Sequence, residues 1–245
     1  MTLQGVNSPL SGNANIDGFI WQEHPTYAKE IPFKNYINYS FDTDLIPDAT
    51  ARDGSHLMTD AQKAGVRAAL SYVSSVTGIT FNEVPNGTSA NTDLVFGTKE
   101  MGSTSPASGM DSYTYNFTAG ASPTLDFTDS ILLNSQRADL ADTSPGTLGY
   151  QTLLEEIGHA LGLKNPTFPP IAVPYMSTNS SFSVLTSLND PIQSTYTAGD
   201  LQALNWLYGG KGLVNTNQVP FGGNASGTIT LVDQHSQSGV FTIYS

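Results

Sequence analysis

Four polar side chains that could bind a metal ion or transfer a proton lie close together in the second half of the chain. Glu155 and His159 are four residues apart, so on a helix they share one face, one turn from each other. Glu156 is one step round the helix and could point at a group that those two residues hold. Gly162 permits a sharp turn after the helix, which would bring Asn165 back toward the same point. The spacing therefore predicts a cluster of carboxylate, imidazole and amide groups where a helix ends.

This segment resembles the zinc signature of the metzincin peptidases, H-E-x-x-H-x-x-G-x-x-H. In that family three histidines bind zinc and the glutamate activates the zinc-bound water. The resemblance implies that Glu156 is the general base of a peptidase and that Gly162 forms the turn after the helix. It also implies that Glu155, His159 and Asn165 occupy the metal-ligand positions, where Glu155 and Asn165 replace two of the family's histidines.

Further segments, in the same order, resemble the catalytic domain of the serralysin branch over about residues 13–210. Met176 lies where the Met-turn of that branch should be, and we expect it to form a packed floor under the site. The implied fold class is α+β, a metzincin-like zincin fold. It has a twisted mixed sheet, a long first helix, an active-site helix and the Met-turn below the site. The segments that carry the likeness are 15–21, 37–41, 59–84, 93–97, 129–134, 175–177 and 200–209.

The departures from the family pattern affect most of the groups that would surround zinc. The serralysin tyrosine ligand, two residues after the Met-turn methionine, corresponds to Thr178. An asparagine is a neutral, weak zinc ligand, and a carboxylate in place of an imidazole lowers the Lewis acidity that water activation needs. Losing even a group that supports a ligand costs roughly 10–100-fold in metal affinity. We therefore expect no cofactor, or zinc only if residual metal binding survives.

The hydrophobic pattern and the capping and turn residues predict the helices and strands that hold this motif. Apolar stripes with capping residues predict three helices, and short alternating or apolar runs predict strands before and between them. Strands and helices do not alternate regularly, which favours an α+β arrangement over a βαβ series. The helices are expected at 59–78, 147–163 and 198–208, and the strands at 36–41, 79–84, 93–97 and 130–134.

Composition narrows the partners and the location. The chain has 245 residues, no cysteine and a net charge of −12, which argues against nucleic acid and anionic membranes as partners. No apolar run reaches the roughly 18 residues of a membrane helix, so we expect no membrane insertion. Residues 1–12 form a polar segment without the pattern of a signal peptide. We expect an extracellular protein that is exported without an N-terminal signal, with the cytoplasm as the alternative.

The expected organisation has three parts: the polar segment 1–12, a serralysin-like domain at 13–210, and a Gly/Asn/Ser/Thr-rich β segment at 211–245 that resembles an incomplete module. The remaining histidines, His24, His56 and His235, are expected on the surface because none has ligand spacing to His159.

Three interpretations of function remain open. The first is a pseudoprotease, catalytically inactive or strongly impaired, that holds a peptide or protein in the former substrate cleft. The second is a zinc-dependent metalloendopeptidase with an atypical ligand set. The third is an inactivated variant of an active protease.

Overall fold

The computed structural model describes residues 2–3, 8, 10–22, 24, 26–30, 34–118, 124–169, 171, 173, 182–186, 191–209, 231–232 and 240–244. Met176, Thr178 and His235 lie outside these residues, so the predicted Met-turn is among the features that stay predictions.

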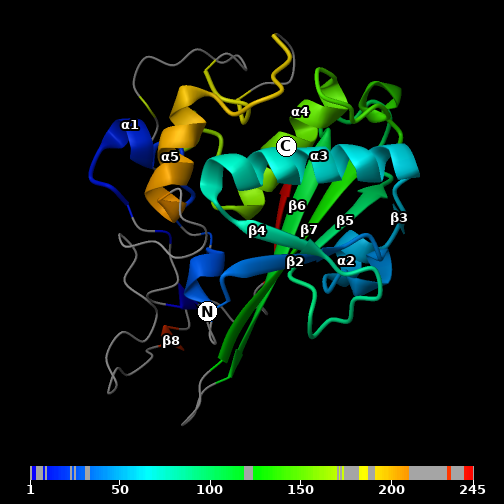
Figure 1. The fold of residues 1–245 in the computed structure, drawn as a ribbon, viewed down its shortest axis with the longest axis horizontal. Coiled ribbons are helices and arrows are strands. Elements are labelled where there is room, and N and C mark those ends of the chain that lie inside the picture. The colour runs from blue at the N-terminus through cyan, green and yellow to red at the C-terminus, as the bar shows by residue number, and fades with distance from the viewer. Residues whose placement is uncertain are drawn as a thin grey trace.

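A seven-stranded mixed sheet forms the centre of the molecule (Figure 1). Its strand order is β4-β2-β5-β7-β6-β9, and β3 pairs with β5 off this path. The pairs β2/β4, β2/β5 and β5/β7 are parallel, whereas β6 is antiparallel to both β7 and β9. The strands are β2 (Tyr36–Ser40), β3 (Ser55–His56), β4 (Thr80–Glu83), β5 (Leu94–Lys99), β6 (Gly109–Thr118), β7 (Thr124–Asn134) and β9 (Val240–Tyr244). A separate two-stranded pair joins β1 (Thr2–Leu3) to β8 (Leu231–Val232).

The three long helices lie where they were predicted, except that the second ends at Ala160 rather than at residue 163. Helix α3 (Asp60–Thr77) begins with a capping box at Thr59 and ends at Gly78, which has a φ of 75° in the left-handed region. Helix α4 (Leu148–Ala160) is capped by the side chain of Thr147, and helix α5 (Ala198–Tyr208) begins with a capping box at Thr197. The short helices are α1 (Ala14–Asp17) and α2 (Ala49–Arg52), with 3-10 turns at Tyr27–Lys29, Thr43–Leu45 and Ala138–Leu140.

Hydrophobic residues cover both faces of the sheet, with the main core on one face and a smaller cluster on the other. Helices α3 and α4 pack on the first face, where alternate residues of β5 and β7, such as Phe96 and Ile131, join the main core. The residues between them, Val95 and Leu132, point the other way into a second cluster with Ile46. This alternation follows from the two-residue period of a strand.

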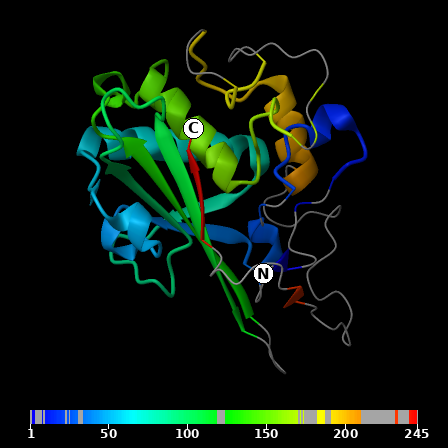
Figure 2. The same cartoon turned by 180° about the vertical axis from the view of Figure 1, so that it is seen from behind.

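Strand β7 is longer than predicted: it begins at Thr124 rather than at residue 130. Its additional residues pair with β6 alone, because β5 reaches only Asp129 to Asn134. Figure 2 shows the resulting two-stranded ribbon extending past the rest of the sheet. The alternation of Tyr113, Tyr115 and Phe117, followed by a glycine at 120 and a proline at 123, was the sequence signal from which this hairpin could have been predicted.

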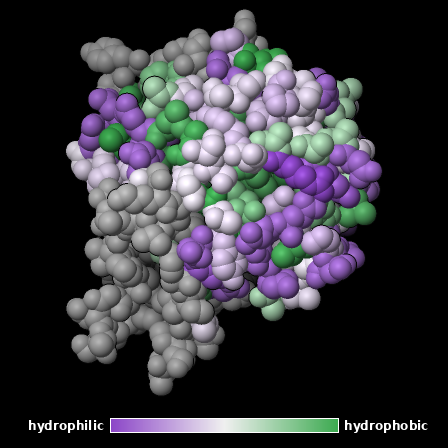
Figure 3. Space-filling model, in the orientation of Figure 1, coloured by the Kyte–Doolittle hydropathy of each residue, from purple (hydrophilic) through white to green (hydrophobic). Residues whose placement is uncertain are grey.

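The architecture confirms an α+β fold with a twisted mixed sheet, a long first helix and a second helix that bears the motif. The pairing of β9 with β6 also places residues 240–244 in the main sheet, and the boundary near residue 210 stays a prediction. On the face shown in Figure 3, polar side chains cover much of the outer surface of α3, with small apolar areas between them. No helix among the described residues is long and apolar enough to cross a membrane.

Candidate functional site

The predicted motif lies in the last turns of α4 and in the turn that follows. All twelve residues from Gly149 to Ala160 are buried, since α4 packs against α3, β6 and β7. Glu155 is 6% exposed, Glu156 0% and His159 4%. The motif is therefore inside the protein rather than along an open face of the helix.

His159 has the protonation state and tautomer of a metal ligand. Its Nδ1 lies 3.0 Å from the carbonyl oxygen of Leu163, and because a carbonyl can only accept, Nδ1 must carry the hydrogen. The lone pair is then on Nε2. Burial lowers the pKa of His159 to about 4, and the bond to Leu163 only partly opposes this, so the ring is neutral near pH 7.

Gly162 makes the sharp turn that the motif predicts. Its φ of 92° lies in the left-handed region, which disfavours any side chain. Its carbonyl accepts a hydrogen bond from the backbone N–H of Trp21 at 2.8 Å, and Ile20 forms a β-bridge with Leu163. These bonds lay the N-terminal segment across the end of α4. The ring of Trp21 consequently contacts His159 edge-on, with 6.2 Å between the ring centroids.

Glu155 and Asn165, the replaced histidine positions, are engaged differently. Burial raises the pKa of Glu155 well above its usual range, and the nearby carboxyl groups of Glu156 and Asp200 raise it further, which disfavours the charged form of the group. The side-chain oxygen of Asn165 accepts hydrogen bonds from the backbone N–H and the hydroxyl of Thr167, at 2.9 and 2.7 Å. Asn165 thus closes its own turn.

Glu156 packs against strand β6. A Cβ placed on Gly109 would lie only 2.4 Å from Oε1 of Glu156 and 2.8 Å from its Cγ and Cδ. The glycine therefore leaves the space that the glutamate side chain fills, and the carboxyl group faces the sheet.

These residues do not fit a zinc site of the metzincin kind. His159 is suited to bind a metal ion, but the side-chain oxygen of Asn165 is used within its own turn, and burial disfavours the charged form of Glu155. Among the described residues, neither Glu155 nor His159 belongs to a group of three His, Asp or Glu side chains whose donor atoms lie within 4.8 Å of one another. No catalytic step through zinc follows from this arrangement.

The structure instead gathers three buried side chains that were not predicted to form a site. His24, Asp111 and Asp129 place one donor atom each within 4.8 Å of one another, and all three are buried. The prediction that His24 is a surface residue is wrong: it is 1% exposed, between Trp21 and Tyr113. It was wrong because the pairing of the N-terminal segment with the end of α4 cannot be read from sequence spacing.

A sequence signal for the two aspartates exists in the strand alternation. Asp129 is in phase with Phe127 and Ile131, which face the main core, so an acid occupies a core position of β7. Asp111 is opposite Ile131 on β6 and shares that face. Burial raises the pKa of Asp129 to about 8 and that of Asp111 well above its usual range, with mutual repulsion as a further cause for Asp111.

A second acidic group, Glu30, Asp93 and Asp126, lies nearby and has its own cation. Lys34 Nζ is 2.5 Å from Asp93, 3.3 Å from Glu30 and 3.5 Å from Asp126. The pKa of Glu30 is still raised to about 8, because its burial outweighs the attraction of Lys34. This group therefore forms a salt-bridge network with lysine at its centre.

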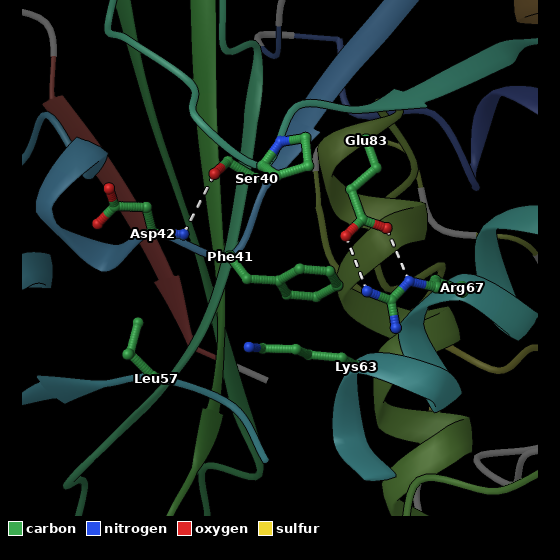
Figure 4. Close-up of a pocket in the computed structure, with 8 residues that line it drawn as sticks. Ser40, Phe41, Asp42, Leu57, Lys63, Arg67 and Glu83 are labelled. Carbon is green, nitrogen blue, oxygen red and sulfur yellow. Dashed lines mark hydrogen bonds and ion pairs between the residues drawn. The ribbon is translucent and has the colours of Figure 1, made fainter. Parts of the chain in front are cut away.

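An open pocket of about 390 Å³ lies away from the motif, between the end of β2 and the start of α3 (Figure 4). Lys63 and Arg67 lie over the ring of Phe41, at 5.6 and 5.3 Å from its centroid. Arg67 donates two hydrogen bonds of 2.7 Å to Glu83. None of the motif residues lines this pocket, so we do not assign the motif's chemistry to it.

Comparison with known proteins identifies the family. A search of curated proteins finds no match. The family model of the matrixins, peptidase family M10, matches residues 47–197, more than half of the chain. The matched range includes α3, the strands β4 to β7 and the whole motif on α4. The chain belongs to the matrixin family of peptidases.

Proposed function

We propose that this chain is a serralysin-like matrixin domain in which peptide hydrolysis is lost or strongly impaired. In this proposal the peptidase fold serves as a binding or structural module outside the cell, and a peptide or protein occupies the former substrate cleft. A fold does not by itself imply its family's chemistry, because chemistry depends on the residues of the site.

The observation that carries the proposal is the state of the three metal positions. Only His159 presents an imidazole with a directed lone pair. The oxygen of Asn165 is satisfied by Thr167, and the burial of Glu155 disfavours the carboxylate form that a metal ion would bind. A catalytic zinc site needs three protein ligands and one open position for water or substrate.

Peptide binding does not require those ligands. An extended peptide can add to the edge of a sheet through main-chain hydrogen bonds alone. The backbone of β6 already accepts an antiparallel strand, since Met110 to Thr114 pair with residues 240–244 of this chain. In this structure β9 occupies that side of β6, so an extended partner next to Glu156 would take the place of β9.

The test is peptide cleavage by the purified chain in the presence of Zn²⁺, compared with a variant that restores both histidines, Glu155→His with Asn165→His. We expect no cleavage by the unaltered chain. The double variant should gain zinc that depends on His159, and any cleavage it shows should disappear when Glu156→Ala is added. Cleavage by the unaltered chain that a chelator and Glu156→Ala both abolish would contradict the proposal.

A zinc-dependent metalloendopeptidase with an atypical ligand set is the second candidate. The neutral, oriented ring of His159 favours it, because that ring alone keeps the geometry of a ligand. This candidate predicts that His159→Gln removes both a bound metal ion and peptide cleavage.

A further inference from the structure

A buried acidic group stands out in the core next to α4, because among the described residues no lysine or arginine is paired with it. Asp111 is 0% exposed and Asp129 is 2% exposed, on the face of the sheet that is otherwise apolar. Among the described residues, neither oxygen of Asp111 and only one oxygen of Asp129 has a hydrogen-bond partner. No ion pair joins either aspartate to a lysine or arginine in this part of the chain. Buried charges in proteins are normally paired or bound to a metal ion.

In the neighbouring group of Glu30, Asp93 and Asp126, a lysine balances the negative charge of the carboxylates. There, the ammonium group of Lys34 contacts three carboxylates. In the group of His24, Asp111 and Asp129, an imidazole and two carboxyl groups lie together instead. His24 Nε2 lies 3.8 Å from Asp111 Oδ2, which is too long for a hydrogen bond.

That separation suits two ligands of one ion. Metal–nitrogen and metal–oxygen bonds of about 2.0–2.2 Å place the ligand atoms of a tetrahedral ion between about 3 and 4 Å apart. The donor atoms of His24, Asp111 and Asp129 all lie within 4.8 Å of one another, so a small contraction would close them around an ion. A divalent ion would also balance the charges of the two carboxylates.

The surroundings hold these ligands in place. The hydroxyl of Tyr27 donates to the second oxygen of Asp129 at 2.5 Å, and the ring of Tyr113 contacts that of His24 with 4.3 Å between centroids. In metal sites, hydrogen bonds and contacts of this kind to the ligand residues fix the orientation of the ligands. The hydroxyl of Ser8 also donates to the carbonyl oxygen of His24 at 2.9 Å, which fixes the backbone there.

We propose that His24, Asp111 and Asp129 bind one divalent transition-metal ion of the Zn²⁺ or Mn²⁺ class. The site is separate from the motif positions 155, 159 and 165 and goes beyond the proposed function. One nitrogen and two carboxylate oxygens suit these ions, whereas Ca²⁺ prefers oxygen ligands alone. The ion would be structural: it joins the N-terminal segment to β6 and β7 and thereby holds Trp21 against His159.

The experiment uses the full chain, stripped with a chelator and then supplied with Zn²⁺ or Mn²⁺. Metal content is counted by elemental mass spectrometry after gel filtration, and thermal unfolding is followed in parallel. We expect about one ion per chain. An ion concentration about 100-fold above Kd should raise Tm by about 5–10 °C.

The variants locate the ion. Asp111→Asn keeps the side-chain volume and should weaken the metal affinity at least about tenfold, which lowers both the metal retained after gel filtration and the Tm shift. His24→Gln is a second variant that should do the same. The controls are Asp126→Asn, in the group that Lys34 compensates, and His159→Gln, in the motif; both should keep the ion.

Three results would overturn the proposal. The first is no stoichiometric ion and no Tm shift in the unaltered chain, which would mean that bound protons neutralise the group. The second is an ion that Asp111→Asn retains. The third is an ion that His159→Gln removes, which would place it on the motif. Peptide cleavage plays no part in this readout, so a failure here leaves the proposed loss of hydrolysis standing, and the reverse also holds.

Discussion

The placement of Glu156 against strand β6 can be tested by filling the space that Gly109 leaves. In Gly109→Ala, the new methyl group would lie 2.4 Å from Oε1 of Glu156 and 2.8 Å from its Cγ and Cδ. Favourable contacts between heavy atoms are about 3.5–4.0 Å, so the whole glutamate side chain must move. Glu156 is 0% exposed and has no solvent to move into. Gly109 has no positive φ, so backbone strain plays no part in the cost.

Overpacking of this kind costs about 1–3 kcal/mol of the free energy of unfolding. Glu156→Ala deletes all three atoms that the new methyl group would meet. In that background, Gly109→Ala should be neutral, or stabilising by a few tenths of a kcal/mol through the lower entropy of the unfolded chain. The double-mutant cycle should therefore give a coupling free energy of about 1–3 kcal/mol between the two positions.

The assay is urea unfolding of the four proteins of the cycle, with m values compared to check that each unfolds in the same way. Gly158→Ala is the matched control on α4, because a Cβ there meets nothing closer than 3.5 Å. It should leave stability unchanged or raise it by up to about 1 kcal/mol. Additivity within about 0.5 kcal/mol would refute the reasoning, because it would mean that Glu156 points away from β6, as a general base facing an open cleft would.

Three further substitutions test the packing of α3, an ion pair on its surface and a hydrogen bond to the end of α4. Gly65→Ala should destabilise the protein by about 1–3 kcal/mol despite its better helix propensity, since its Cβ would lie 2.3 Å from the backbone oxygen of Thr143; a gain in Tm would contradict this. Arg67→Gln should lower stability near pH 7 by no more than about 1 kcal/mol, because the pair is partly exposed. The Arg67 guanidinium lowers the pKa of Glu83, so this difference is present above the unfolded pKa near 4.5 and should vanish as the pH falls through the lower folded pKa; a difference in urea midpoint that persists at pH 3 would argue against it. Tyr208→Phe removes a buried hydrogen bond of 2.8 Å to the end of α4 and should cost about 1–3 kcal/mol in urea unfolding; an unchanged midpoint would show that the carbonyl finds another donor.

The amino-acid sequence alone determined those features that depend on near neighbours in the chain. The capping residues Thr59 and Thr197 begin helices where predicted, and Gly78 ends the first of them. The four-residue spacing of Glu155 and His159 likewise predicted a shared helix face, and Gly162 predicted the turn that follows. Caps, turns and helical faces involve residues within about four positions of each other, so composition and spacing are enough to predict them.

Only the tertiary structure decided which distant side chains meet. His24 reaches Asp111 and Asp129 because a β-bridge at Ile20 lays the N-terminal segment over the end of α4, and because β6 and β7 pair in one particular register. A slip of either strand by one residue would turn its aspartate to the other face of the sheet and separate the two carboxyl groups. The same long-range packing buries Glu156 against β6. Strand order, register and burial arise from contacts between segments far apart in the chain, and local patterns alone do not determine them.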